Sequence, residues 1–126
     1  MNYPQGSLWH KWDLHVHTPD SIFHCYAGGE SQQWDNFIDD LASLPPEFKV
    51  IGINDYIFLE GYRKVLAAKT AGRLPNLDLV LPVIELRLDR FGGRDNHFSR
   101  VNCHVLFSDE VQVDLIESQF LSTLKS

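Results

Sequence analysis

One short apolar segment limits most sharply what this chain can fold into. Residues 49–55 read Lys-Val-Ile-Gly-Ile-Asn-Asp, a nearly continuous apolar run. A strand with apolar side chains in both directions must be covered on both faces, which is typical of a parallel sheet flanked by helices. The segment therefore predicts a buried parallel strand.

The remaining chain supplies further strands and helices in alternation. Residues 11–18 alternate between apolar and polar side chains, the period of a strand with one covered face. Ser31 is the expected N-cap of a helix that ends before Pro45 and Pro46. Its apolar positions, spaced to form one helix face, are Trp34, Phe37, Ile38 and Leu41. The other expected elements are a helix over 61–70, strands over 77–88 and 101–108, and a helix over 111–124.

This order of elements predicts an α/β fold with a mainly parallel sheet or an open barrel. The last two strands are expected to form a hairpin, because the polar loop between them, around Gly92 and Gly93, has no helical pattern. With 126 residues the chain is long enough for one domain. The final helix runs straight into the last residues without a stop signal, so we expect the N-terminal part of a larger domain.

Charge and cysteine content restrict the partners and the compartment. The net charge of -6 gives duplex nucleic acid no long-range attraction to the molecule as a whole, so a phosphate ligand needs local cations or metal. Cys25 and Cys103, in a chain without a secretory signal, are expected to be reduced thiols of a cytoplasmic protein. No apolar run approaches the ~20 residues of a membrane span.

Two histidines are the strongest candidates for metal ligands. His15 and His17 lie two residues apart on the first expected strand, so both imidazoles point to the same side, with Asp13 behind them. A pair of imidazoles on a rigid strand is suited to bind a metal ion. The alternative is the ordinary polar face of a half-buried strand.

A carboxylate on the third strand is the next candidate. Glu85 lies among apolar residues, where burial of its charge is costly unless the carboxylate is paired or binds metal. If metal binds there, Arg87 is the natural anchor for a phosphate. The alternative is a side-chain pair between Glu85 and Arg87.

Two further residues complete the candidate set. His104 shares a strand face with Asn102, and it is either a metal ligand or a hydrogen-bonded core histidine, whereas Cys103 points to the other face, toward the core. Asp55 ends the second strand, at the carboxyl end where open α/β sheets place their catalytic groups. Its alternative role is that of a turn or cap aspartate.

Taken in order, these segments resemble the first motifs of the PHP family of metal-dependent phosphoesterases. The motifs are Asp13-Leu-His-Val-His-Thr18, then Gly52-Ile-Asn-Asp55-Tyr56, then Glu85, then His104-Val-Leu-Phe-Ser108. The similarity covers nearly the whole chain. It is greatest to PHP domains at the front of large bacterial ATPases of the AAA-like or SMC-like kind.

The resemblance implies a distorted (βα)7 barrel, of which this chain is the N-terminal part, with up to three zinc, manganese or iron ions. It implies that His15 and His17 bind a first ion, that Glu85 is a bridging ligand, and that His104 binds a second ion. The implied reaction is hydrolysis of a phosphoester by a metal-activated water. The implied partners are a phosphate-containing substrate, such as a nucleotide or nucleic-acid end, and an ATPase region of the same protein.

Two alternatives remain open at this stage. Tyr56 stands where the family motif has a histidine, which favours a degenerate module that binds metal, nucleotide or a partner chain without catalysis. Amidohydrolase-type barrels also carry His-x-His on their first strand, but they commonly add a bridging lysine, which no strand here offers clearly. Because a partial barrel leaves an open sheet edge, self-association is also expected.

Overall fold

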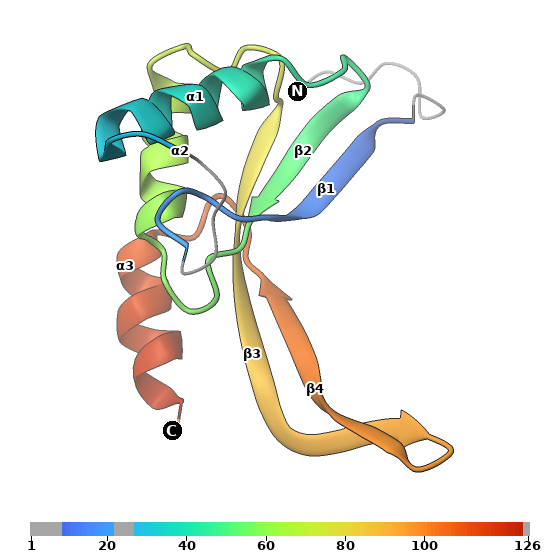
Figure 1. Ribbon diagram of the computed structural model, residues 1–126. Coiled ribbons are helices and arrows are strands. Elements are labelled where there is room, and N and C mark those ends of the chain that lie inside the picture. Colours follow the sequence, from blue (N-terminus) through green and yellow to red (C-terminus); the bar gives the residue numbers. More distant parts are fainter. Residues whose placement is uncertain (1–8, 22–26, 125–126) are drawn as a thin grey trace.

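The elements follow one another largely as the sequence predicts. The computed structural model describes residues 9–21 and 27–124, and Figure 1 shows their arrangement. In chain order the elements are β1 (Lys11–Val16), α1 (Glu30–Ala42), β2 (Phe48–Ile53), α2 (Glu60–Thr70), β3 (Leu79–Arg94), β4 (His97–Leu106), α3 (Val113–Leu115), a π-helical turn η1 (Ile116–Phe120) and a 3-10 turn η2 (Leu121–Thr123).

The described strands form one curled, half-barrel-like sheet in the order β1-β2-β3-β4. β1, β2 and β3 are parallel, whereas β3 and β4 form an antiparallel hairpin, so the mixed α/β class and the hairpin are confirmed. The helices cover one face of the sheet, and the other face is the open, concave side (Figure 1). In the described part of the chain, no helix is long and apolar enough to cross a membrane.

The core lies between the sheet and the helices. β2 is its centre, since Ile51 and Ile53 are almost inaccessible to solvent, and the prediction of a buried parallel strand is confirmed. α1 contributes the apolar positions expected from its sequence. The core side chains from the sheet and helices include Phe37, Ile38, Leu41, Ile51, Ile53, Tyr62, Val65, Val80, Ile84, Val113 and Ile116.

The start of the first helix and the form of the last helical segment differ from the prediction. α1 begins at Glu30 with Gly29 as its N-cap, so Ser31 lies inside the helix and is not the cap. Residues 111–124 do not form one regular helix, because only three residues are α-helical before the π and 3-10 turns. Ser122 and Thr123 donate hydroxyl hydrogen bonds to main-chain carbonyls there, which competes with regular helical bonding.

The β3–β4 hairpin is longer than predicted. Gly92 and Gly93 lie within β3 rather than in a loop, and the chain reverses at Asp95 and Asn96. Both turn residues have positive φ, 53° and 64°, as the favoured two-residue hairpin turns require. A Cβ on Gly93 would lie 1.8 Å from the carbonyl oxygen of His97, so glycine lets the strands pair closely there. The glycine pair, interpreted as a loop, instead extends the sheet.

The turn makes a prediction about hairpin stability. Asn96→Gly should keep or raise the stability of the hairpin by up to about 1 kcal/mol, because glycine adopts positive φ at no steric cost. Asn96→Val should lower it by about 1–2 kcal/mol, because a branched side chain is strained in this conformation. Amide hydrogen exchange along β3 and β4 measures the difference, and equal protection in both variants would show that the turn does not limit the hairpin.

The cysteine prediction is partly tested. Cys103 is a free thiol on β4 and is partly buried, on the side of that strand expected from the alternation. Cys25 lies outside the described residues.

Candidate metal centre

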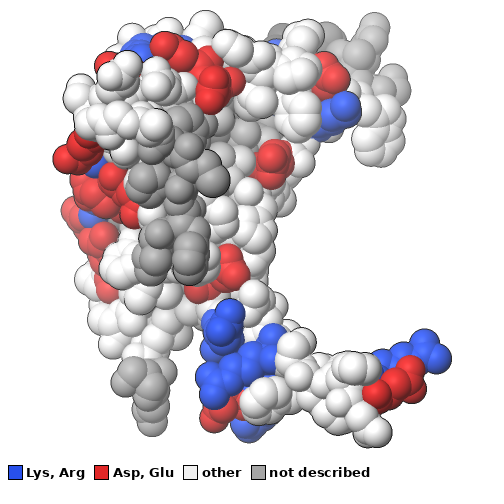
Figure 2. All heavy atoms as spheres, in the orientation of Figure 1, with Lys and Arg blue, Asp and Glu red and all other residues white. Residues whose placement is uncertain are grey.

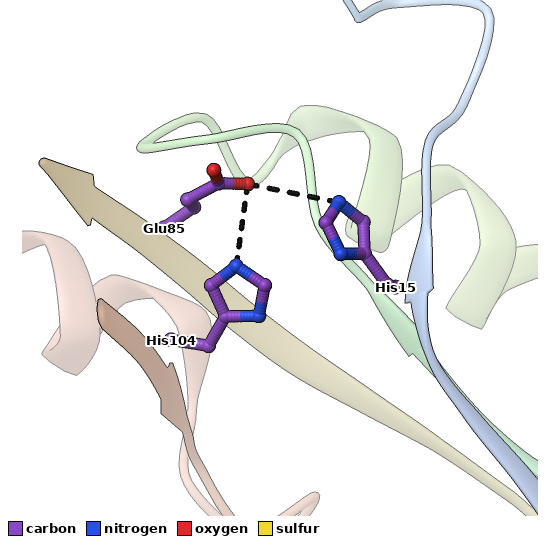
Figure 3. Close-up of side chains that lie close together, drawn as sticks. All are labelled: His15, Glu85 and His104. Atoms are coloured by element: carbon purple, nitrogen blue, oxygen red, sulfur yellow. Dashed lines mark ion pairs between the residues drawn. The ribbon is translucent and has the colours of Figure 1, made fainter. Parts of the chain in front are cut away.

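Three candidate ligands from three strands meet on the concave face. His15 comes from β1, Glu85 from β3 and His104 from β4 (Figure 3). Glu85 Oε2 lies 3.8 Å from His15 Nε2 and 3.5 Å from His104 Nε2. One ligand atom from each residue lies within 4.8 Å of those of the other two. We refer to these three residues as the His–Glu–His cluster.

Strand register explains why these three side chains meet. Glu85 and His104 are directly opposite each other in the β3–β4 hairpin, so their side chains leave the same face as close neighbours. His15 reaches them from β1, across the curl of the sheet. The pairing of β1 with β2 slips here, so that Leu14 and His15 together lie opposite Gly52. A Cβ on Gly52 would come within 2.9 Å of Leu14 Cα, so glycine permits this close approach.

Glu85 is the best-anchored member of the cluster. Asn54 donates a side-chain hydrogen bond to Oε2 at 3.0 Å, and Asn102 donates one to Oε1 at 3.1 Å. The Glu85 main-chain N–H donates to the carbonyl of Tyr56 at 2.9 Å. Its side chain is only 11% exposed, a position where a carboxylate needs such donors. Amide donors on both oxygens hold the carboxylate in one orientation before any ligand arrives.

The donor set and its spacing fit a divalent metal ion. Zinc binds imidazole nitrogen and carboxylate oxygen at about 2.0–2.2 Å, and tetrahedral geometry then separates ligand atoms by roughly 3.3–3.6 Å. The spacings of 3.5 and 3.8 Å around Glu85 Oε2 are close to that value. His15 and His104 are partly exposed, with side-chain exposures of 51% and 31%. Solvent or a ligand therefore has access to the position between the three side chains.

His17 adjoins the cluster through His15. His17 directly follows β1, which ends at Val16, and the two Nε2 atoms are 3.1 Å apart, so the two imidazoles point to the same side as predicted. Nδ1 of His17 is buried and has no hydrogen-bond partner among the described residues. The ring of Tyr56 stacks on His17, with a centroid separation of 5.4 Å and an interplanar angle of 28°. Tyr56 holds this place with a φ of 63°, which is rare for an aromatic residue and marks a constrained site.

Asp55 is buried beneath the start of α2 rather than open on the concave face. Its carboxylate accepts a hydrogen bond from the Thr18 main-chain N–H at 2.9 Å and a second, short one from the Thr18 hydroxyl. Its carbonyl accepts from the N–H of Phe58, closing a turn. These contacts are those of a turn aspartate, the alternative role considered from the sequence. Burial raises the pKa of Asp55 above its ordinary value of 3.8, although the Thr18 hydrogen bonds act in the opposite direction.

The raised pKa of Asp55 predicts a specific pH dependence. The folded protein binds the Asp55 proton more tightly than the unfolded chain does, so the associated stability is present below pH 3.8 and is lost as pH rises through the folded-state pKa. The free energy of unfolding of the wild type should therefore fall relative to that of Asp55→Asn as pH increases across this window. Urea denaturation of both proteins at several pH values measures the difference, and a pH-independent difference would contradict the prediction.

Arg87 lies next to the cluster but is not part of it. It is exposed on β3, directly opposite Asn102 and two residues beyond Glu85. Among the described residues no ion pair joins Arg87 to Glu85, whose partners are the two asparagines and the two histidines. The guanidinium is therefore available to a ligand that approaches along the concave face.

Sequence reasoning missed the two asparagines that hold Glu85. Asn102 had a detectable signal, because strand alternation places it on the face of His104. Asn54 had a weaker one, as a fully buried polar residue at the end of an apolar strand. Neither signal indicates a carboxylate partner, since the partner is set by contacts between distant segments.

The fold and the site together define a mixed α/β chain with a His–Glu–His cluster on the concave face of its sheet. Comparisons with models of protein families, with curated proteins and with solved structures found no match to this chain.

Proposed function

We propose that this chain is a metal-binding phosphoesterase domain of the PHP type, with the His–Glu–His cluster as its metal centre. The observation that carries the proposal is the meeting of His15, Glu85 and His104, from three strands, with ligand atoms within 4.8 Å of one another, close enough to hold a divalent ion after small side-chain shifts. The order of motifs along the chain, which resembles that family, supports it. The curled four-stranded sheet is compatible with the first part of a distorted (βα)7 barrel.

Each residue of the site has a role in this proposal. His15, Glu85 and His104 hold one ion, and His17 offers a nitrogen for a second. When bound, divalent zinc, manganese or iron supplies Lewis acidity that lowers the pKa of water and polarises a phosphoester. Arg87, exposed beside the cluster, binds the phosphate group of the substrate. Asp55 acts by positioning, because its bonds to Thr18 hold the loop that follows His17.

Metal content is the decisive test. The purified protein, dialysed against a weak chelator, should retain about one zinc, manganese or iron ion per chain by elemental analysis. The double variant His15→Ala/His104→Ala should lose it, while its far-ultraviolet circular dichroism stays unchanged. His97→Ala is the matched control, because His97 is an exposed histidine at the far end of β4. A folded wild type that holds no metal after reconstitution, or equal loss in the control, would refute the proposal.

A second function, binding without catalysis, is favoured by one observation. The Tyr56 ring covers His17, and a neutral phenol does not replace an imidazole as a ligand. A module of this kind would bind metal or nucleotide and regulate an attached ATPase region. Turnover of a phosphodiester by the metal-loaded protein, lost in His15→Ala/His104→Ala, would exclude it. Metal binding without turnover of phosphoesters or amides would support it.

A further inference from the structure

The distal part of the β3–β4 hairpin projects beyond the helices as an arm (Figure 1). Residues 87–100 of the arm contain four arginines and two aspartates, a net charge of +2. Because the whole chain has a net charge of -6, the other residues together carry a net charge of -8. Figure 2 shows Lys and Arg gathered at the base and tip of the arm, while Asp and Glu predominate on the body. The arginines are Arg87, Arg90, Arg94 and Arg100. Residues 87–100 therefore carry a local excess of cations in a chain whose net charge is negative.

One face of the arm is continuous with the His–Glu–His cluster. Along β4, alternate residues lie on the same side of the strand. From the cluster outward this side carries His104, Asn102, Arg100 and Phe98. Their partners on β3 are Glu85, Arg87, Phe91 and Gly93. Between the pairs Arg87–Asn102 and Phe91–Arg100 the register is irregular, because residues 88–90 lie opposite Val101 alone. The hairpin bends at this point, but the two pairs are an even number of positions apart on both strands, so the side chains beyond it return to the same face.

This face presents aromatic rings to solvent. Phe91 is 63% exposed and Phe98 is 64% exposed. The guanidinium of Arg100 lies over the ring of Phe91, 5.8 Å from its centroid. Gly93, opposite Phe98, leaves the surface beside that ring without a side chain. Exposed rings interleaved with arginines are the combination that holds single-stranded nucleic acid, because bases stack on the rings and phosphates meet the cations.

We propose that the Phe91–Phe98–Arg100 face of the arm binds single-stranded nucleic acid and leads its end toward the His–Glu–His cluster. Guidance of the strand end to the cluster rests on the proposed phosphoesterase function, whereas binding of nucleic acid by the arm does not. His104 lies six positions along β4 from Phe98, a path of about 20 Å at 3.3 Å per residue. A bound strand that follows this face would pass Arg87 before it reaches the cluster.

A second copy of the chain fits the arm less well. Stable protein interfaces bury roughly 800 Å² on each partner, whereas the arm is only two strands wide and offers two large rings. Base stacking needs little more than the rings themselves. The acidic body repels a polyanion, so binding should depend on the arm alone and weaken steeply with salt.

The test is fluorescence anisotropy with a labelled oligothymidylate of about twelve nucleotides, at low salt and with a chelator present. Phe98→Ala should weaken binding about tenfold, the effect of losing one stacked base. The matched control Val101→Ala removes an exposed apolar side chain from the opposite face and should change binding less than about twofold. Arg100→Ala should likewise weaken binding more than Arg94→Ala, since Arg94 pairs with His97 on the opposite face.

The outcomes separate the two proposals. Binding that persists in His15→Ala/His104→Ala but falls in Phe98→Ala establishes the arm independently of metal. Stoichiometric metal in a protein that does not bind the oligonucleotide refutes the arm and leaves the metal centre standing. Equal losses in Phe98→Ala and Val101→Ala also refute it. Light scattering that shows a dimer, converted by Phe98→Ala to a monomer without any oligonucleotide binding, would assign the arm to self-association instead.

Discussion

Glu85→Gln should lower the affinity for a divalent ion at least 100-fold while the domain stays folded. The carboxylate is the acidic member of the His–Glu–His cluster, and both imidazoles face its Oε2. Glutamine has the same shape but offers a neutral oxygen, so the electrostatic attraction for the ion is lost. Its NH2 group would also face an amide donor from Asn54 or Asn102, which costs about one hydrogen bond, roughly 1 kcal/mol.

Two further variants should give smaller losses of metal affinity than Glu85→Gln. Asn102→Ala removes one donor to Glu85 without removing a ligand, so affinity should fall about 10–100-fold, as it does for partners that orient metal ligands. Glu110→Gln, at an exposed position outside the cluster, should leave affinity unchanged. Isothermal titration with zinc measures all three variants. Equal affinities for Glu85→Gln and Glu110→Gln would show that Glu85 is not a ligand.

Gly61→Ala should lower the free energy of unfolding by about 2–4 kcal/mol. Gly61 is buried in the first turn of α2, and a Cβ there would lie 2.1 Å from Asp55 Oδ2 and 2.4 Å from Thr18 Oγ1. These two atoms are hydrogen-bonded to each other, so neither side chain can move away without breaking that bond. The gain in helix propensity, about 1 kcal/mol, is too small to offset the lost bond and the overpacking.

The matched control for this substitution is Gly29→Ala. Gly29 is the N-cap of α1, its φ is -70°, and a Cβ there would meet nothing within 4 Å. The free energy of unfolding of Gly29→Ala should therefore differ from that of the wild type by less than about 1 kcal/mol. Urea denaturation measures both variants, and a Gly61→Ala protein as stable as Gly29→Ala would show that the packing of Thr18 and Asp55 beneath α2 is not tight.

Local patterns were sufficient to predict much of the fold. The alternation in residues 11–18 placed His15 and His17 on one side of the strand, and their 3.1 Å contact confirms it. The apolar run at 49–55 became the buried central β2. The hairpin was also expected, but its length was not. The glycines that suggested a loop allow two strands to pair closely, and this depends on the partner strand rather than on the glycines alone.

For the candidate site, some features follow from the sequence alone and others depend on tertiary contacts. The sequence by itself determined which residues carry metal-binding groups and which strand faces they share, because side-chain direction follows from periods of about 2 and 3.6 residues. Only the tertiary structure decided that His15 meets Glu85 and His104, that two asparagines orient Glu85, and that Asp55 is buried against Thr18. Strand register, sheet curl and helix packing set those contacts, and each depends on side chains far apart along the chain.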